Sequence, residues 1–88
     1  MISRDQFLAL RPCKDAVVLP GGERLEVISN ISTVGIPTDA PGPREIGLRW
    51  PDGHYAEYGW SDAEKAIMDE DYGRELSLND PAAEVVAI

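Results

Sequence analysis

Residues 45–60 read EIGLRWPDGHYAEYGW, and this stretch decides what kind of fold the chain can form. Ile46, Leu48 and Trp50 alternate with small or charged residues, so they lie on one face of a strand. The Pro-Asp-Gly sequence at 51–53 is typical of a tight turn, after which residues 54–60 return as a second strand. Trp50 continues the apolar face and is the largest side chain on it, so we expect it to be buried.

The returning strand carries aromatic residues on both of its faces. By alternation, Tyr55 and Glu57 lie on one face, whereas Tyr58 and Trp60 lie on the other. We therefore expect one of the two aromatic sets to be exposed.

Three further features are expected before this hairpin. Ser3 followed by Gln6 forms a capping box, which predicts a short helix at about 3–10 that ends before Pro12. The aliphatic run at 16–19, the turn residues at 20–22 and the alternating run at 25–28 predict another hairpin. Residues 35–43 contain three prolines and two glycines, which predicts a loop without regular structure.

Beyond the hairpin, Ser61 and Glu64 form a second capping box and Gly73 is a natural helix stop, so we expect a second helix at about 62–72. Residues 84–88 are apolar after Glu84 and are expected either to add an edge strand or to fray. The chain is too short for two cores, so residues 1–88 are expected to form one domain. Its predicted class is α+β, with a short N-terminal helix, a four-stranded antiparallel sheet and the C-terminal helix at 62–72.

The net charge of the chain is confined to its second part. Residues 1–51 hold six acids and six bases, whereas residues 52–88 hold ten acids and two bases, and this difference accounts for the net charge of −8. A duplex would be repelled by this charge, so direct binding of nucleic acid is not expected. A field concentrated on one side favours a partner protein with a basic surface.

The sequence offers little for catalysis or for metal binding. A zinc site needs three or four Cys or His ligands, and the chain has only Cys13 and His54. Nothing in the sequence brings these two residues together as a nucleophile and a base, so a small enzyme that uses His54 ranks lowest of the hypotheses. We therefore expect no enzymatic activity, no cofactor and no metal.

The leading hypothesis is a non-enzymatic inhibitor or decoy. Its acidic side chains would imitate the phosphates of a nucleic acid and occupy a basic nucleic-acid-binding surface of a partner, as small anti-restriction and anti-CRISPR proteins of phages and other mobile elements do. The alternative reading of the same acids is a surface that only keeps the protein soluble. The candidate partner-binding residues are Glu57, Asp62, Glu64, Asp69, Glu70, Asp71 and Glu75.

A second hypothesis about the function rests on residues 17–60. Gly21-Gly22, Leu25, Val27, Trp50 with Asp52-Gly53, and Tyr55 form a pattern that resembles small SH3-like or Tudor-like barrels. The resemblance implies an adaptor or assembly factor that holds a peptide against Trp50, Tyr55 and Tyr58. The loop at 35–43 and the acidic stretch after Trp60 depart from that pattern.

Cellular location is inferred from what the sequence lacks. A lone cysteine cannot form an intramolecular disulfide, and the longest aliphatic runs have four residues. These features predict a cytoplasmic protein that does not enter a membrane.

Overall fold

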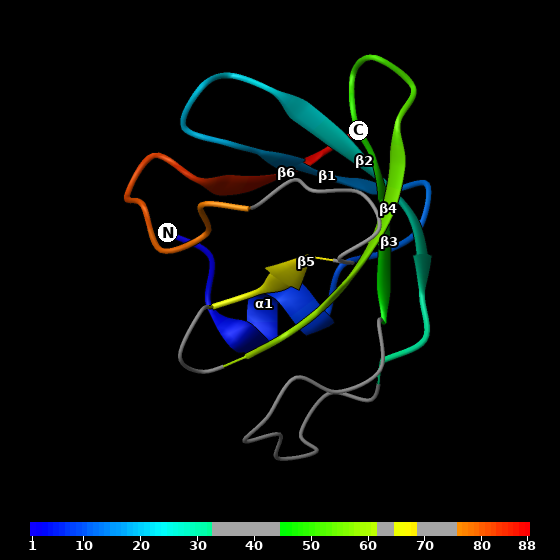
Figure 1. Ribbon diagram of the computed structural model, residues 1–88, viewed down its shortest axis with the longest axis horizontal. Helices are drawn as coiled ribbons and strands as arrows, with labels where there is room; N and C mark the ends of the chain where they lie inside the picture. Colours follow the sequence, from blue (N-terminus) through cyan, green and yellow to red (C-terminus); the bar gives the residue numbers. More distant parts are fainter. Residues whose placement is uncertain (33–44, 62–64, 69–75) are drawn as a thin grey trace.

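The computed structural model of the chain describes residues 1–32, 45–61, 65–68 and 76–88. Its centre is a six-stranded antiparallel sheet with the strand order β5-β4-β3-β2-β1-β6 (Figure 1). The elements are α1 (Arg4–Leu8), β1 (Asp15–Val18), β2 (Arg24–Asn30), β3 (Ile46–Arg49), β4 (Tyr55–Gly59), β5 (Ile67–Met68) and β6 (Glu84–Ala87).

Both hairpins expected from the sequence are present. In the first, Val17 of β1 pairs with Leu25 of β2, and both side chains are fully buried. In the second, Leu48 of β3 pairs with Ala56 of β4, again within the core. The β3–β4 turn needs Gly53, because its φ of 90° is a conformation that residues with a side chain rarely adopt.

The first helix is also confirmed, although it is short. The side chain of Ser3 accepts a hydrogen bond from the Gln6 backbone N–H, and the Gln6 side chain accepts one from the Ser3 N–H, which completes the expected capping box. Phe7 and Leu8 of this helix are buried. A five-residue helix is unstable alone, so packing against the sheet is what retains it.

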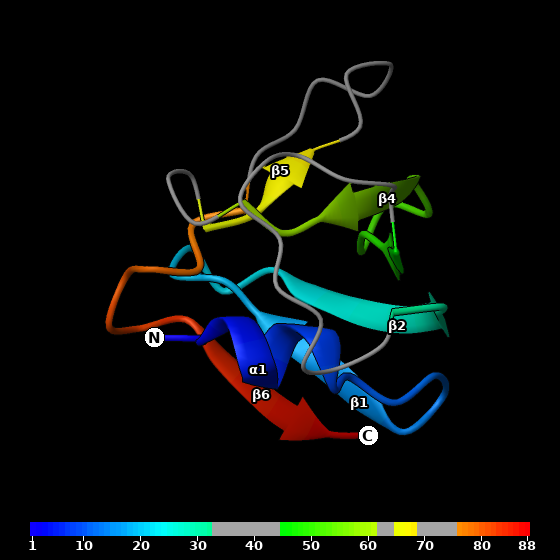
Figure 2. The same ribbon diagram turned by 90° about the horizontal axis from the view of Figure 1, so that it is seen from below.

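The core is formed by one face of the sheet together with α1 and the segments at both ends of the chain. In Figure 2, α1 lies toward the end of the molecule that holds β1 and β6, whereas β4 and β5 lie at the opposite end. Phe7 packs against Trp60, with ring centroids 5.6 Å apart. The other large buried side chains are Ile2, Leu10, Val17, Leu25, Val27, Ile46, Leu48, Tyr58 and Leu78.

The prediction of an α+β fold with a C-terminal helix at 62–72 is wrong. Among the described residues the helix is α1, Lys65 has a φ of 73°, and the next strand, β5, pairs through Ile67 with Gly59 of β4. The sequence pattern at 61–73 satisfies local helix rules, but backbone pairing with the edge of β4 satisfies the same hydrogen-bonding groups at 67–68. Residues 62–64 and 69–72 lie outside the described residues.

The sheet is larger than the four strands expected. Residues 84–87 form β6, so an edge strand rather than a frayed end is observed. The predicted loop at 35–43 lies outside the described residues. Within the described part of the chain, no helix has both the length and the apolar character that crossing a membrane requires.

Candidate functional site

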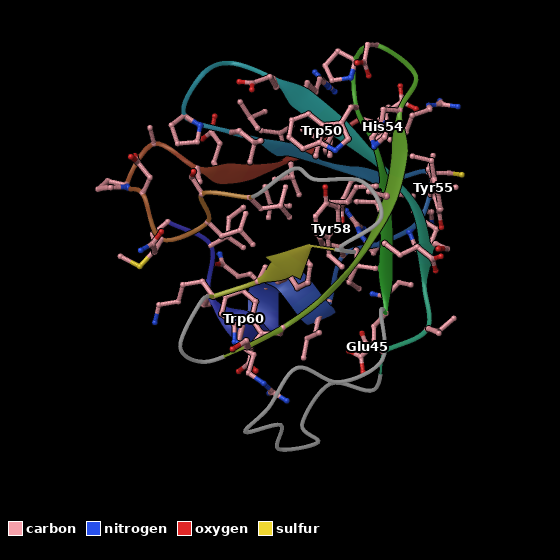
Figure 3. The ribbon with its side chains drawn as sticks, viewed as in Figure 1. Glu45, Trp50, His54, Tyr55, Tyr58 and Trp60 are labelled. Atoms are coloured by element: carbon pink, nitrogen blue, oxygen red, sulfur yellow. The ribbon has the colours of Figure 1, made fainter. Side chains whose placement is uncertain are left out.

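The three aromatic residues proposed as one peptide-binding set are divided between the two faces of the β3–β4 hairpin. Trp50 and Tyr58 lie in the core, with exposed fractions of 8% and 0%. Trp50 Nε1 donates a buried hydrogen bond to the Tyr58 hydroxyl at 3.0 Å. Figure 3 shows these two side chains on the inner side of the hairpin and Tyr55 on the outer side. The expected burial of Trp50 is therefore confirmed, and Tyr55 is the member of the set that lies on the outer face.

The side chain of Tyr55 packs against the face of the sheet that is turned away from the core. A Cβ added to Gly47 would lie 2.9 Å from Cε2 of Tyr55 and would also overlap the Tyr55 hydroxyl. The Tyr55 hydroxyl is 3.4 Å from Oγ of Ser29 on β2. The missing side chain of Gly47 thus leaves the space in which the ring packs, and the exposed part of the ring forms an amphipathic surface.

Next to Tyr55 an ion pair crosses the same face. Arg49 stands opposite Tyr55 on one side and opposite Glu26 on the other. Its Nη2 is paired with the Glu26 carboxylate, and both side chains are about half exposed. An ion pair of this exposure contributes little to stability.

Glu57 is the charged residue of this face that has no such partner. It is two residues after Tyr55 on β4, stands opposite Gly47 and is half-buried. No ion pair or hydrogen bond joins its carboxylate to any side chain in the described part of the chain. A partly desolvated carboxylate next to an aromatic ring can accept a cationic group, which would gain both the charge pair and the face of the ring.

We call this surface the outer face, which consists of Glu26, Ser29, Gly47, Arg49, Tyr55 and Glu57. It joins one residue from each candidate set, namely Glu57 from the acidic set and Tyr55 from the aromatic set. The other acidic candidates, Asp62, Glu64, Asp69, Glu70, Asp71 and Glu75, lie outside the described residues.

The described residues that could act in catalysis or bind metal are separate features of the fold. His54 closes the β3–β4 turn through its backbone: its carbonyl accepts from Trp50 N–H at 2.7 Å, and its N–H donates to the Asp52 carboxylate at 3.0 Å. Cys13 is exposed next to β2, where its N–H donates to the Val27 carbonyl. Within the described ranges, no group of three or more His, Cys, Asp or Glu side chains could hold a metal ion.

Sequence reasoning identified Tyr55 and Glu57 but did not identify their neighbours on the outer face. Strand alternation already placed Tyr55 and Glu57 on one face, and the structure confirms that arrangement. Glu26 and Ser29 come from β2, whose alignment with β3 shifts at a bulge between Val27 and Ser29. The position of a bulge depends on pairing between strands, so alternation within one strand could not reveal these neighbours.

Comparisons with known proteins add no relative to this description: no protein-family model matches the chain, no curated protein matches it, and no solved structure matches it.

Proposed function

We propose that this chain is a non-enzymatic protein-binding domain that docks its acidic side on a basic surface of a partner protein. The observation that carries the proposal is the outer face, where the half-buried Glu57 carboxylate has no cationic partner among the described residues and lies beside Tyr55. The excess of eight negative charges in residues 52–88 supplies the long-range attraction. Tyr55 and Glu57 supply the short-range contact, a lysine or arginine side chain of the partner being the complementary group.

The proposed partner surface is one that normally binds nucleic acid. Such surfaces present spaced lysine and arginine side chains, and a protein whose carboxylates cover one side competes for them. The chain would then act as an inhibitor or decoy in the cytoplasm, of the anti-restriction or anti-CRISPR type. The proposal needs no cofactor and no direct contact with nucleic acid.

A second candidate function is an SH3-like adaptor that binds a peptide through aromatic contacts. This candidate rests on the resemblance of residues 17–60 to small SH3-like barrels, and β1 to β4 form an antiparallel meander. The burial of Trp50 and Tyr58 reduces the accessible aromatic surface of that candidate to Tyr55. The adaptor would therefore bind mainly through one ring and the adjoining backbone of the sheet.

Binding to a defined basic probe tests the first candidate against the second. The probe is an arginine-rich peptide, titrated at low and high salt against the parent chain and Glu57→Gln. The matched control is Glu23→Gln, which removes the same charge from an exposed position in the β1–β2 turn. We expect Glu57→Gln to weaken binding roughly two- to fivefold at low salt and Glu23→Gln to have a smaller effect.

The same titration identifies the outcome that favours the adaptor. A docking surface for cations loses affinity steeply with salt, because the attraction is screened over about 10 Å at 0.1 M. Equal affinity at both salt concentrations, together with loss of binding in Tyr55→Ala, would support aromatic recognition instead. A pull-down from the native host at the same two salt concentrations then identifies the partner, and its competition with nucleic acid tests the decoy mechanism.

A further inference from the structure

Among the described residues, the last strand of the sheet has a strand partner on one side only. β6 pairs with β1 on one side, in the register Ala16 with Val86 and Val17 with Val85. It is the terminal strand of the sheet, and Figure 2 shows it at the end of the molecule opposite β5. No described strand covers its other side, where the Met1 ammonium group donates to the Ala83 carbonyl just before β6.

The hydrogen-bond pattern determines which groups of β6 point outward. The Ile88 N–H donates to the Lys14 carbonyl at 2.9 Å, so Ile88 faces β1. In an antiparallel pair every second residue faces the same neighbour, which places Glu84 and Val86 toward β1 as well. Val85 and Ala87 therefore direct their N–H and C=O groups away from the sheet.

Of the features that usually prevent strand pairing, this edge has a short length and one charged side chain, Glu84, at its start. Residues 84–88 contain no proline or lysine, and the pairing of β6 with β1 has no bulge. The side chain of Val86 is half-buried on the face opposite the core, and Ile88 is 62% exposed. An edge of this kind is suited to receive another strand.

We propose that β6 binds the β6 strand of a second copy of this chain in an antiparallel, two-fold symmetric pair. The outward residues Val85 and Ala87 determine the register, because Val85 of one copy must exchange hydrogen bonds with Ala87 of the other. The two Val86 residues then meet at the two-fold axis as a pair that is not hydrogen-bonded. All four outward N–H and C=O groups of Val85 and Ala87 in each copy are satisfied by this one register.

The side chains and charges of β6 fit the same register. In this register, two residues that stand opposite each other are both odd-numbered or both even-numbered, so their side chains lie on the same face. The core face of one sheet therefore continues into the core face of the other. Glu84 stands opposite Ile88 of the second copy, and the two Glu84 residues are about 13 Å apart along the strand direction. At this separation their repulsion is largely screened at ordinary salt, and Val86 meets Val86 with no charge between them.

The net charge of −8 on each copy predicts how dimer formation depends on salt concentration. Two like-charged molecules repel, so added salt should strengthen dimer formation. The proposed docking on a basic partner has the opposite dependence, since salt weakens it. Failure of the two proposals can therefore be told apart in the same buffers.

Cysteine cross-linking tests the register directly. Residues that face each other as a non-hydrogen-bonded antiparallel pair have Cα atoms about 4.5 Å apart, within the range that a disulfide spans. In a Cys13→Ser background, Val86→Cys should form a covalent dimer on mild oxidation. The matched control is Glu84→Cys in the same background, which should give at most a small fraction of that yield because Glu84 faces Ile88. Equal cross-linking of the two variants would overturn the proposed register.

Sedimentation equilibrium of the otherwise unmodified protein tests the association itself. The parent chain should change from monomer to dimer as its concentration rises into the high micromolar range, with a lower dissociation constant at high salt. Val86→Glu places two carboxylates at the two-fold axis and should raise the dissociation constant roughly tenfold relative to the uncharged control Val86→Thr. A parent chain that remains monomeric at both salt concentrations, or equal association of these two variants, would overturn the proposal. If Val86→Glu fails to fold, the parent chain and the cross-linking pair still decide the result.

Discussion

Asp15 illustrates how a charged residue is accommodated in this small core. It is 7% exposed, and its carboxylate accepts bonds from Arg11 Nε at 3.1 Å and Nη2 at 2.8 Å, as well as from the Arg11 backbone N–H. The hydrogen bond from the Arg11 side chain is the main cause that lowers the pKa of Asp15, while burial opposes it. The charged form of Asp15 is therefore the form that the folded state prefers.

This shift predicts a pH dependence of stability. A carboxylate whose pKa is lower in the folded than in the unfolded state stabilises the fold above the unfolded value, about 3.9, and this contribution is lost as the pH falls through the folded value. We expect Asp15→Asn to be less stable than the parent chain at pH 7. The difference should shrink as the pH falls below about 4, which urea unfolding across pH 7 to 2 measures. A difference that stays constant over that range would contradict the role of the ionised carboxylate.

Gly47 carries a second prediction at this scale. A methyl group at this position would overlap the ring and hydroxyl of Tyr55, so Gly47→Ala should displace the ring and destabilise the fold by about 1 kcal/mol. In a Tyr55→Ala background the added methyl group meets no ring but still lies 2.5 Å from Oγ of Ser29, so the penalty should be smaller without disappearing. A double-mutant cycle by chemical unfolding measures the coupling. If the two substitutions have additive effects on the free energy of unfolding, the Tyr55 ring does not need the space above Gly47 for its packing.

At the scale of elements, α1 depends on side chains that come from β2 and the residues after it. Asn30 Nδ2 donates to the Leu8 and Leu10 carbonyls at 2.9 and 2.7 Å, and Ser32 Oγ donates to the Leu8 carbonyl at 2.7 Å. These bonds satisfy carbonyls that a helix of five residues cannot satisfy itself. The helix is thus capped at its N-terminus by its own sequence and at its C-terminus by a distant one.

Asn30→Ala should therefore destabilise the protein and increase fraying of α1. We expect a loss of about 1–3 kcal/mol, because the Leu10 carbonyl loses the Asn30 donor and the Leu8 carbonyl keeps only the Ser32 hydroxyl. Asn79→Ala is the matched control, since Asn79 is exposed, and it should change stability by less than about 0.5 kcal/mol. Urea unfolding gives the global effect, and amide exchange at Phe7 and Leu8 reports on the helix. Unchanged exchange at these two residues would show that α1 does not need the Asn30 bonds.

At the scale of the whole molecule, the charge asymmetry is the property that bears on partners. The acids Asp69, Glu70 and Asp71 belong to the part of the chain that carries the whole net charge. We expect the combined change of these residues to Asn, Gln and Asn to slow association with a basic partner roughly tenfold at low salt and much less at high salt. The control is Asp5→Asn with Glu23→Gln, from the electrically balanced first part.

Stopped-flow or biosensor association rates at two ionic strengths measure this effect, and a thermal melt beside them checks that both variants fold. If the acidic variant and the control have the same association rates at both salt concentrations, these acids serve only to keep the protein soluble. In that case the effect of Tyr55→Ala on binding becomes the deciding measurement for the adaptor alternative.

Local sequence patterns determined a large part of this fold. The alternation at 46–50 and 55–58, the turn at 51–53 and the capping box of Ser3 predict the β3–β4 hairpin, the burial of Trp50 and the first helix, because each depends on residues a few positions apart. The same alternation placed Tyr55 and Glu57 together on one face. Charge counting located the acidic part of the chain, since charge is a property of composition.

Only the tertiary structure decided the rest. Residues 67–68 match a helical pattern, yet they pair with the edge of β4, because a strand edge offers backbone partners that local sequence cannot reveal. The bulge in β2 and the space above Gly47 place Ser29, Arg49 and Glu26 around Tyr55, and both depend on how neighbouring strands align. The outward edge of β6 likewise exists only because β1 occupies its other side, so the surface proposed for a second copy depends on strand order and hydrogen-bond register.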